Sequence, residues 1–95
     1  MGLRFEWDPH KAKLNLKRHG VSFFEASTVF SDPLASINDD PDHSDLETRM
    51  HLIGASERLR ILVVVYTERG EKMRIINARR ATPIERSQYE KKTRK

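Results

Sequence analysis

The sequence contains no cysteine, and this absence excludes disulfide scaffolds, zinc sites built on thiolates and thiol nucleophiles. No stretch approaches the roughly 20 apolar residues of a membrane-spanning helix. The chain turns charged at Arg4 and Glu6, so we expect no signal peptide. Together these absences favour a cytoplasmic protein, because they indicate neither an oxidising compartment nor a membrane.

Glycine and histidine are too scattered to form the familiar ligand motifs. The four glycines stand apart, so the chain has no glycine-rich phosphate loop. The histidines stand at positions 10, 19, 43 and 51 and do not form an H-E-x-x-H pair. The sequence therefore predicts no metal site and no cofactor.

The length allows one domain, which we expect to span residues 1–95. Hydrophobic residues make up 37% of the chain and charged residues 34%. A chain of this size buries only roughly 60–65% of its unfolded surface. We therefore expect a thin core and a large polar surface.

Acidic and basic residues are distributed unevenly. Residues 1–48 hold 5 Lys or Arg against 9 Asp or Glu, whereas residues 49–95 hold 13 against 5. Eleven of the 18 basic residues are arginine, whose planar guanidinium suits bidentate contacts with phosphate. The basic half is compatible with a polyanionic partner such as nucleic acid, and the alternative is a solvated charged surface.

The chain begins with a pattern typical of a short strand and a surface helix. Apolar and charged residues alternate over Leu3–Trp7, which predicts an edge strand. Asp8 is a good N-cap and is followed by proline, and Gly20 is a typical residue just beyond a helix end. These signals predict a helix over Pro9–Arg18.

A second helix is predicted over Phe23–Phe30, where apolar residues follow helical spacing. Ser22 and Glu25 before and within it have the spacing of a capping box. Proline after Asp32 then breaks the helix, and Leu34–Ile37 is compatible with a short strand.

The second half of the chain predicts an antiparallel sheet and a closing helix. Hairpin spacing separates its strands, and Thr82 with Glu85 forms the strongest helix-start signal, because proline lies between them. The expected order is β-α-α-β-β-β-β-α, an α+β fold with a small antiparallel sheet and helices packed mainly on one face. The expected strands are 50–54, 61–66 and 73–78, and the helix is Pro83–Lys91.

Two consecutive arginines, Arg79 and Arg80, end the last predicted strand. Strand alternation sends their side chains to opposite faces, with Arg79 in phase with Ile75 and Arg80 in phase with Ala78. One of the two must therefore point to a sheet face that the helices do not cover.

Two further arginines stand at strand ends: Arg49 opens a strand and Arg69 closes one. Arginines clustered around an open sheet face could clamp a phosphodiester and stabilise charge on its oxygens. The alternative is that these side chains are solvated or paired with nearby carboxylates.

Acid–base chemistry has its best candidates at the exit of an acidic loop. His43 and Glu47 can exchange protons with a ribose hydroxyl, because imidazole titrates near neutrality and carboxylate accepts a proton. The alternative is a turn in which Glu47 pairs with Arg49. Tyr66 could stack on a base or donate to a phosphate, or could be a core residue with a wet tip.

A series of short motifs runs through most of the chain. In the first half they are Phe5–Pro9, Lys11–Ala12, Asn15, Arg18–Phe23, Glu25–Ala26, Val29–Phe30 and Asp32–Pro33. In the second half they are His43–Ser44, Glu47, Arg49, Ile53–Gly54, Ser56, Val64–Gly70, Arg74–Ile76, Ala78–Arg79, Ala81–Thr82, Glu85–Arg86 and Tyr89–Glu90. In order and spacing these motifs resemble the BrnT toxins of bacterial type II toxin–antitoxin systems. Asn77 departs from the resemblance, because the family often has serine there.

The resemblance implies a RelE-like fold and a ribonuclease that arrests translation. It also implies neutralisation by a BrnA-type antitoxin, in a complex that could hold two copies of each chain. Operator DNA would be contacted only through the antitoxin.

On this hypothesis the chain is a metal-independent endoribonuclease in which a ribose 2′-hydroxyl attacks the adjacent phosphate. Arg79 and Arg80 would stabilise the developing charge with Arg49 and Arg69 in support, and His43 or Glu47 would be the base. The residues expected to hold RNA are Lys11, Lys17, His19 and Arg74. The alternative is a non-catalytic basic module that docks an antitoxin or nucleic acid.

Overall fold

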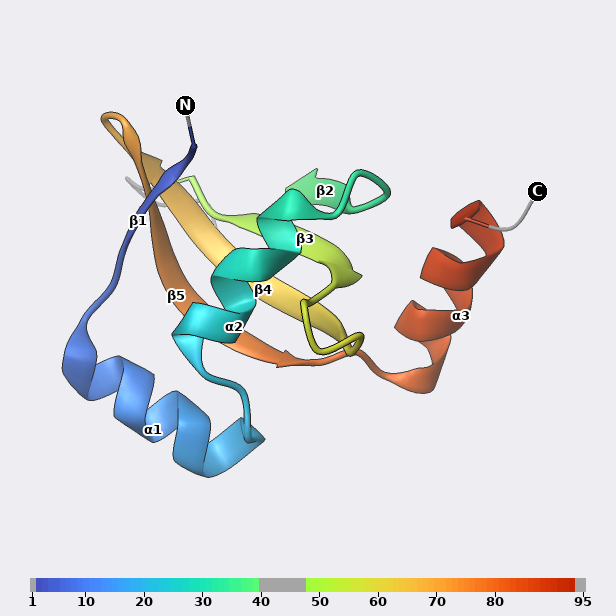
Figure 1. Ribbon diagram of the computed structural model, residues 1–95, viewed down its shortest axis with the longest axis horizontal. Coiled ribbons are helices and arrows are strands. Elements are labelled where there is room, and N and C mark those ends of the chain that lie inside the picture. The colour runs from blue at the N-terminus through green and yellow to red at the C-terminus, as the bar shows by residue number, and fades with distance from the viewer. Residues whose placement is uncertain (1, 40–47, 94–95) are drawn as a thin grey trace.

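The computed structural model describes residues 2–39 and 48–93, which form an α+β fold (Figure 1). The elements follow one another in the predicted order, with a short 3₁₀ turn, η1, after the second helix. They are β1 (Arg4–Glu6), α1 (Pro9–His19), α2 (Phe23–Thr28), η1 (Val29–Ser31), β2 (Ser36–Asp39), β3 (Met50–Ala55), β4 (Ile61–Arg69), β5 (Lys72–Arg80) and α3 (Pro83–Thr93).

The five strands form one sheet in the order β1-β5-β4-β3-β2. Neighbours among β2 to β5 pair antiparallel, as predicted, whereas β1 runs parallel to β5. The parallel pair is short: it joins Arg4–Glu6 to the first residues of β5. The chain then leaves the sheet for α1, so the second half of β5 has no strand on its outer side.

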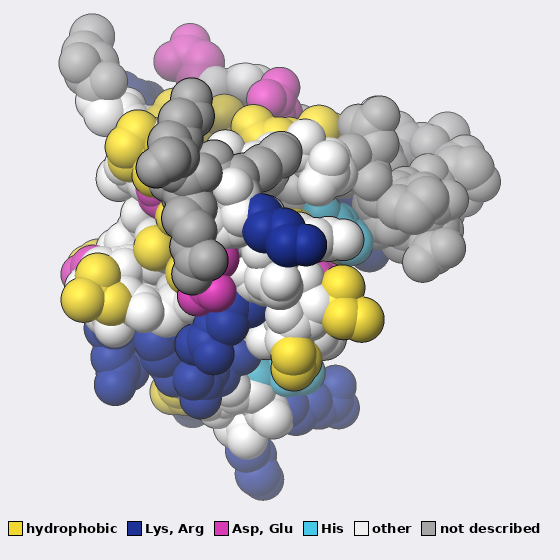
Figure 2. Space-filling model, turned by 90° about the vertical axis from the view of Figure 1, so that its right-hand side faces the viewer, with side chains coloured by type: hydrophobic (Ala, Val, Ile, Leu, Met, Phe, Trp, Pro, Cys, Tyr) yellow, Lys and Arg dark blue, Asp and Glu magenta, His cyan; other side chains and the backbone are white. Residues whose placement is uncertain are grey.

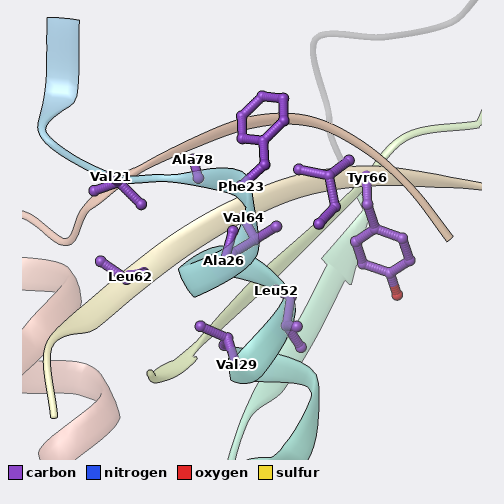
Figure 3. Packing of buried hydrophobic residues seen from close by; sticks show 10 residues of the cluster. Val21, Phe23, Ala26, Val29, Leu52, Leu62, Val64, Tyr66 and Ala78 are labelled. Carbon is purple, nitrogen blue, oxygen red and sulfur yellow. The ribbon is translucent and has the colours of Figure 1, made fainter. Parts of the chain in front are cut away.

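The core lies between the sheet and the two N-terminal helices. Helix α2 crosses one face of the sheet in Figure 1, and α1 lies beside it against β5. Figure 3 shows side chains from α2 and the segment before it lying against those of β3, β4 and β5. Two of the three helices therefore cover one face, as expected, and α3 extends beyond the end of the sheet. The buried cluster consists of Val21, Phe23, Ala26, Val29, Leu52, Leu62, Val64, Tyr66, Ile75 and Ala78.

A β-bulge in β5 changes which residues share a face. Tyr66 pairs with Ile75, but Val65 pairs with Asn77, so one residue of β5 is extra. Beyond the bulge Arg79 lies on the face opposite that of Ile75. The predicted phase of Arg79 with Ile75 was therefore wrong, because simple alternation assumes an uninterrupted strand.

Local side-chain hydrogen bonds shift the ends of two predicted elements. Helix α2 ends at Thr28 rather than Phe30, where the Thr28 hydroxyl donates to the carbonyl of Glu25 at 2.6 Å and competes with the helical pattern. Strand β2 begins at Ser36 rather than Leu34. A carboxylate oxygen of Asp32 accepts from the Leu34 amide at 2.9 Å and holds that segment in a turn.

The start of α2 carries only half of the predicted capping box. Ser22 Oγ accepts from the Glu25 amide at 2.9 Å, but the Glu25 carboxylate is buried and does not return to Ser22. It accepts instead from Ser56 Oγ at 2.7 Å and from the Arg60 guanidinium. The Arg60 hydrogen bond lowers the pKa of Glu25, so this anion ties α2 to the β3–β4 turn.

The start of α3 carries a complete capping box. The Thr82 amide donates to Glu85 Oε1 at 2.8 Å, and Thr82 Oγ1 accepts from the Glu85 amide at 3.2 Å. The same carboxylate accepts two hydrogen bonds from Arg79, at 2.8 and 3.0 Å. The pKa of Glu85 is lowered to about 2, and the hydrogen bonds from Arg79 are the largest cause.

Asn15 fills the place that a neighbouring strand would take along the second half of β5. Its side-chain amide donates to the carbonyls of Ala78 at 2.8 Å and Val21 at 2.9 Å, and its oxygen accepts from the Ala78 amide at 3.2 Å. Asn15 is only 5% exposed. One carboxamide thus satisfies buried backbone groups at the strand edge and fixes α1 beside it.

Replacing Asn15 with Ala is expected to lower the free energy of unfolding by about 3 kcal/mol, because it leaves several buried backbone groups without partners. Urea denaturation followed by circular dichroism measures the change. Lys17→Ala, on the exposed side of the same helix, is the control and should stay within about 0.5 kcal/mol of the parent. A loss below about 1 kcal/mol for Asn15→Ala would contradict this role.

The Arg79–Glu85 pair is expected to make stability depend on pH. Because folding lowers the pKa of Glu85 from 4.5 to about 2, its contribution is complete above pH 4.5 and is lost as the pH falls toward 2. Glu85→Gln should therefore be less stable than the parent at neutral pH, and the two should converge over that acid range. Urea unfolding across the pH range tests this.

Glu90→Gln is a matched control on the same helix, because Glu90 pairs with Arg86 at 4.0 Å and both side chains are about half exposed. A stability gap between Glu85→Gln and the parent that persists unchanged at pH 2 would rule out this linkage.

Candidate nucleic-acid interface

The sheet face opposite α1 and α2 is called the open face below. Residues paired across strands share a face, so the register places Arg79, Val63 and Ile53 in one row on it. In the next row, Asn77 of β5 and His51 of β3 lie on either side of Val65 of β4. One predicted arginine therefore points to the face opposite α1 and α2, where Val63 beside it is only 1% exposed.

Arg79 lies where α3 borders the open face. Within the described residues its guanidinium makes two hydrogen bonds to Glu85 and one to the Arg80 carbonyl at 3.3 Å. A guanidinium has five N–H donors, so Arg79 can still donate to an added anion. Figure 2, which views the α3 side of the molecule, shows Lys and Arg side chains gathered next to acidic ones.

The four arginines predicted at strand ends do not form one cluster. Arg79 pairs with Val63, six positions along β4 from Arg69, which corresponds to about 20 Å of extended strand. Arg49 directly precedes β3 at the same end of the sheet as Arg69. Arg80 is exposed on the opposite face from Arg79, beside the core residues of that face.

Four of the other predicted site residues fall into three groups. Tyr66 is only 3% exposed, and its ring packs against Phe30 with centroids 4.9 Å apart, so it is a core residue. Burial also raises the pKa of Tyr66. Arg74 donates to Glu6 at 3.1 Å. His43 and Glu47 lie outside the described residues.

A hollow of about 250 Å³ lies between α1 and the free edge of β5. None of its described lining residues is a carboxylate, and the cationic groups come from one helix. Asn77 lines the hollow and also lies on the open face, so the two surfaces are continuous. Its lining residues are Lys11, Leu14, Asn15, Arg18, His19, Ile76 and Asn77.

Helix α1 carries positive charge that the described residues do not neutralise by close ion pairs. Lys17, Arg18 and His19 occupy its last turn and are all exposed. Within the described part of the chain, no carboxylate lies within ion-pair distance of any of them. In contrast, Arg74 and Arg79 each already donate to a carboxylate, that of Glu6 and that of Glu85.

The cationic hollow includes two of the residues that the sequence singled out. Lys11 and His19 were predicted to hold RNA and do line the hollow, whereas Arg18 was not predicted. The signal was present, since Lys11 and Arg18 are seven residues apart and so share one face of a helix. Asn77 and His51 were not among the predicted residues either, because their place on the open face follows from strand register rather than from a motif.

Comparison with known proteins identifies the family. A family model described as the ribonuclease toxin BrnT of type II toxin–antitoxin systems matches residues 7–85. Among solved structures, the fold matches the ribonuclease toxin BrnT of Brucella abortus with a TM-score of 0.62 and 24% identity, over 85% of this chain and 99% of that chain. No curated protein sequence matches significantly. Within residues 2–39 and 48–93, no helix is long and apolar enough to cross a membrane.

The family match covers most of the chain, including α1, the sheet and the start of α3. The structural match agrees with it in fold. The chain therefore belongs to the family of BrnT ribonuclease toxins of type II toxin–antitoxin systems.

Proposed function

We propose that this chain is a cytoplasmic toxin that cleaves RNA internally, without a metal ion, and so inhibits translation. Family membership gives the ribonuclease class. The observation that carries the proposal for this chain is the cationic hollow between α1 and β5, which is continuous through Asn77 with the open face that bears Arg79. Phosphates bind where cations lack internal partners, because binding there breaks no existing ion pair.

In this proposal the RNA backbone lies along α1 and crosses the edge of β5 onto the open face. Lys11, Arg18 and His19 hold phosphates at the hollow, and Lys17 contributes from the same helix. Arg74 and Arg79 follow on β5. Arg49 and Arg69 contact flanking phosphates at the far end of the sheet, and Arg80 contacts the backbone from the end of β5.

The proposed reaction is an internal transesterification. A general base takes the proton of a ribose 2′-hydroxyl, and the 2′-oxygen forms a bond to the adjacent phosphorus. The bond from phosphorus to the 5′-oxygen breaks, and a general acid gives that oxygen a proton. Arg79 donates hydrogen bonds to the phosphoryl oxygens, where negative charge increases.

We choose candidate proton-transfer groups by their place in the chain or on the open face and by the ability of their side chains to exchange protons. His43 and Glu47 remain the candidates from sequence, and His51 is added because it lies on the open face in the row of Asn77. Glu85 is next to Arg79, but a pKa of about 2 makes it a weak base at neutral pH.

The family implies an antitoxin partner. We propose that this partner is of the BrnA type and that the complex contains two toxin and two antitoxin chains. The antitoxin would carry the contact with operator DNA.

The cleavage proposal predicts dependence on the ribose hydroxyl. An oligonucleotide with one ribose linkage among deoxyribose linkages should be cut at that linkage only, and its all-deoxy counterpart should stay intact. Arg79→Ala should slow cleavage by about 10²–10³-fold, the usual effect of losing one charge-stabilising donor. Gel electrophoresis of the oligonucleotides after incubation with purified protein measures both the site and the rate of cleavage.

Arg86→Ala is the control, since Arg86 is exposed on α3 and has no role in the proposed site. Binding of both oligonucleotides without any cutting would support the non-catalytic module and refute the enzyme. In the same assay, rates against pH for His51→Gln and His43→Gln show which imidazole moves a proton, because its loss removes one limb of the profile.

A further inference from the structure

Two large apolar side chains of the helical layer are exposed next to each other. Leu16 of α1 is 52% exposed and Phe24 of α2 is 64% exposed, and both line a hollow of about 240 Å³ between the two helices. Leu59 and Ile84 are even more exposed but do not line it. A contiguous apolar hollow is typical of an interaction site, whereas single apolar residues scattered over a surface are common and need no partner.

The floor of this hollow is already packed. Phe23 is buried in the core, and the Trp7 ring stands edge-on to it with ring centroids 6.0 Å apart. Ala12 adds a small side chain beside them. An apolar partner can therefore enter without rearranging the floor, which lowers the cost of binding.

The polar groups of the lining favour a helix as the occupant. Ser22 Oγ already accepts from the Glu25 amide, and the other polar groups among the described lining residues are the Lys13 ammonium and the Trp7 indole N–H. An added strand would find no row of backbone groups to pair with here. A helix satisfies its own backbone groups and can present a row of apolar side chains to the groove.

The charges around the hollow favour an acidic partner. Lys13 lines the hollow, and Lys17 follows one helical turn later on the same helix. Among residues 2–39 and 48–93, no carboxylate lines the hollow. Glu25, the acidic residue next to Phe24, is buried against Ser56 and Arg60 and does not reach this surface.

We propose that the hollow between α1 and α2 is the docking site for an acidic amphipathic helix of the antitoxin. This inference rests on the proposed function for the identity of the partner. Apolar residues of that helix fill the space between Leu16 and Phe24, and carboxylates beside them meet Lys13. Helix α1 separates this hollow from the cationic hollow, so the bound antitoxin lies one helix width from the RNA surface.

The first test measures the affinity of purified variants for a purified antitoxin of the proposed BrnA type. Leu16→Glu and Phe24→Glu should each weaken binding roughly 30-fold or more, as expected for central apolar contacts. Lys13→Glu should weaken it several-fold and reduce its salt dependence. Leu34→Glu is the matched control, because Leu34 is 53% exposed but lies outside the hollow. Unchanged affinity in Leu16→Glu and Phe24→Glu would overturn the proposal.

The second test needs no substitution that could disturb folding. Trp7 is the single tryptophan of the chain and lines the hollow, so 5-fluorotryptophan placed in the toxin alone reports on this site. Its ¹⁹F signal should shift when the antitoxin is added to saturation. A complex that forms without any shift would overturn the docking site.

These readouts separate the docking site from the proposed function. RNA cleavage by Leu16→Glu and Phe24→Glu should equal that of the parent, with neutralisation lost. If the parent cuts no RNA but the ¹⁹F signal shifts, the ribonuclease proposal fails and the docking site stands. If the parent cuts RNA but the ¹⁹F signal does not shift, the ribonuclease proposal stands and the docking site fails.

Discussion

The contact of Asn15 with Ala78 is the constraint on which the arrangement of the candidate interface depends. Strand β1 leaves β5 after three paired residues, and the backbone beyond would otherwise present unpaired groups inside the protein. The Asn15 carboxamide satisfies both the amide and the carbonyl of Ala78. Because Asn15 is in the middle of α1, this contact also places Lys11 on one side and Arg18 on the other at the strand edge.

The basic residues fall into two classes, according to whether they already donate to a carboxylate. Arg60, Arg74 and Arg79 all donate to carboxylates and so contribute to the fold. The cations at the end of α1 have no such partners among the described residues, and they also lie at the negative end of the helix dipole, which stabilises them there. This difference among the described residues is the reason why we propose that the RNA backbone follows α1.

Much of the fold could be predicted from local patterns, whereas the site could be predicted only in part. Helix caps at Asp8 and Thr82 act within a few residues, so sequence spacing was sufficient for them. The bulge in β5 and the capture of Glu25 by Arg60 depend on contacts between segments far apart in the chain. The arginines were expected to converge because each stands at a strand end, but strand ends lie at both ends of a sheet. Only the register shows which end each one occupies.

The most direct test of the proposed RNA surface compares the removal of charge on the two sides of α1. Lys11→Gln and Arg18→Gln neutralise the cationic hollow, and Lys13→Gln removes the same charge from the same helix but faces the apolar hollow. Affinity for a non-cleavable single-stranded oligonucleotide should fall several-fold for each of the first two, and the slope of log affinity against log salt should drop by about 0.7 for each phosphate that is no longer neutralised. Lys13→Gln should bind as the parent does. Equal losses in all three variants, or in none, would contradict the placement of RNA along this edge of the sheet.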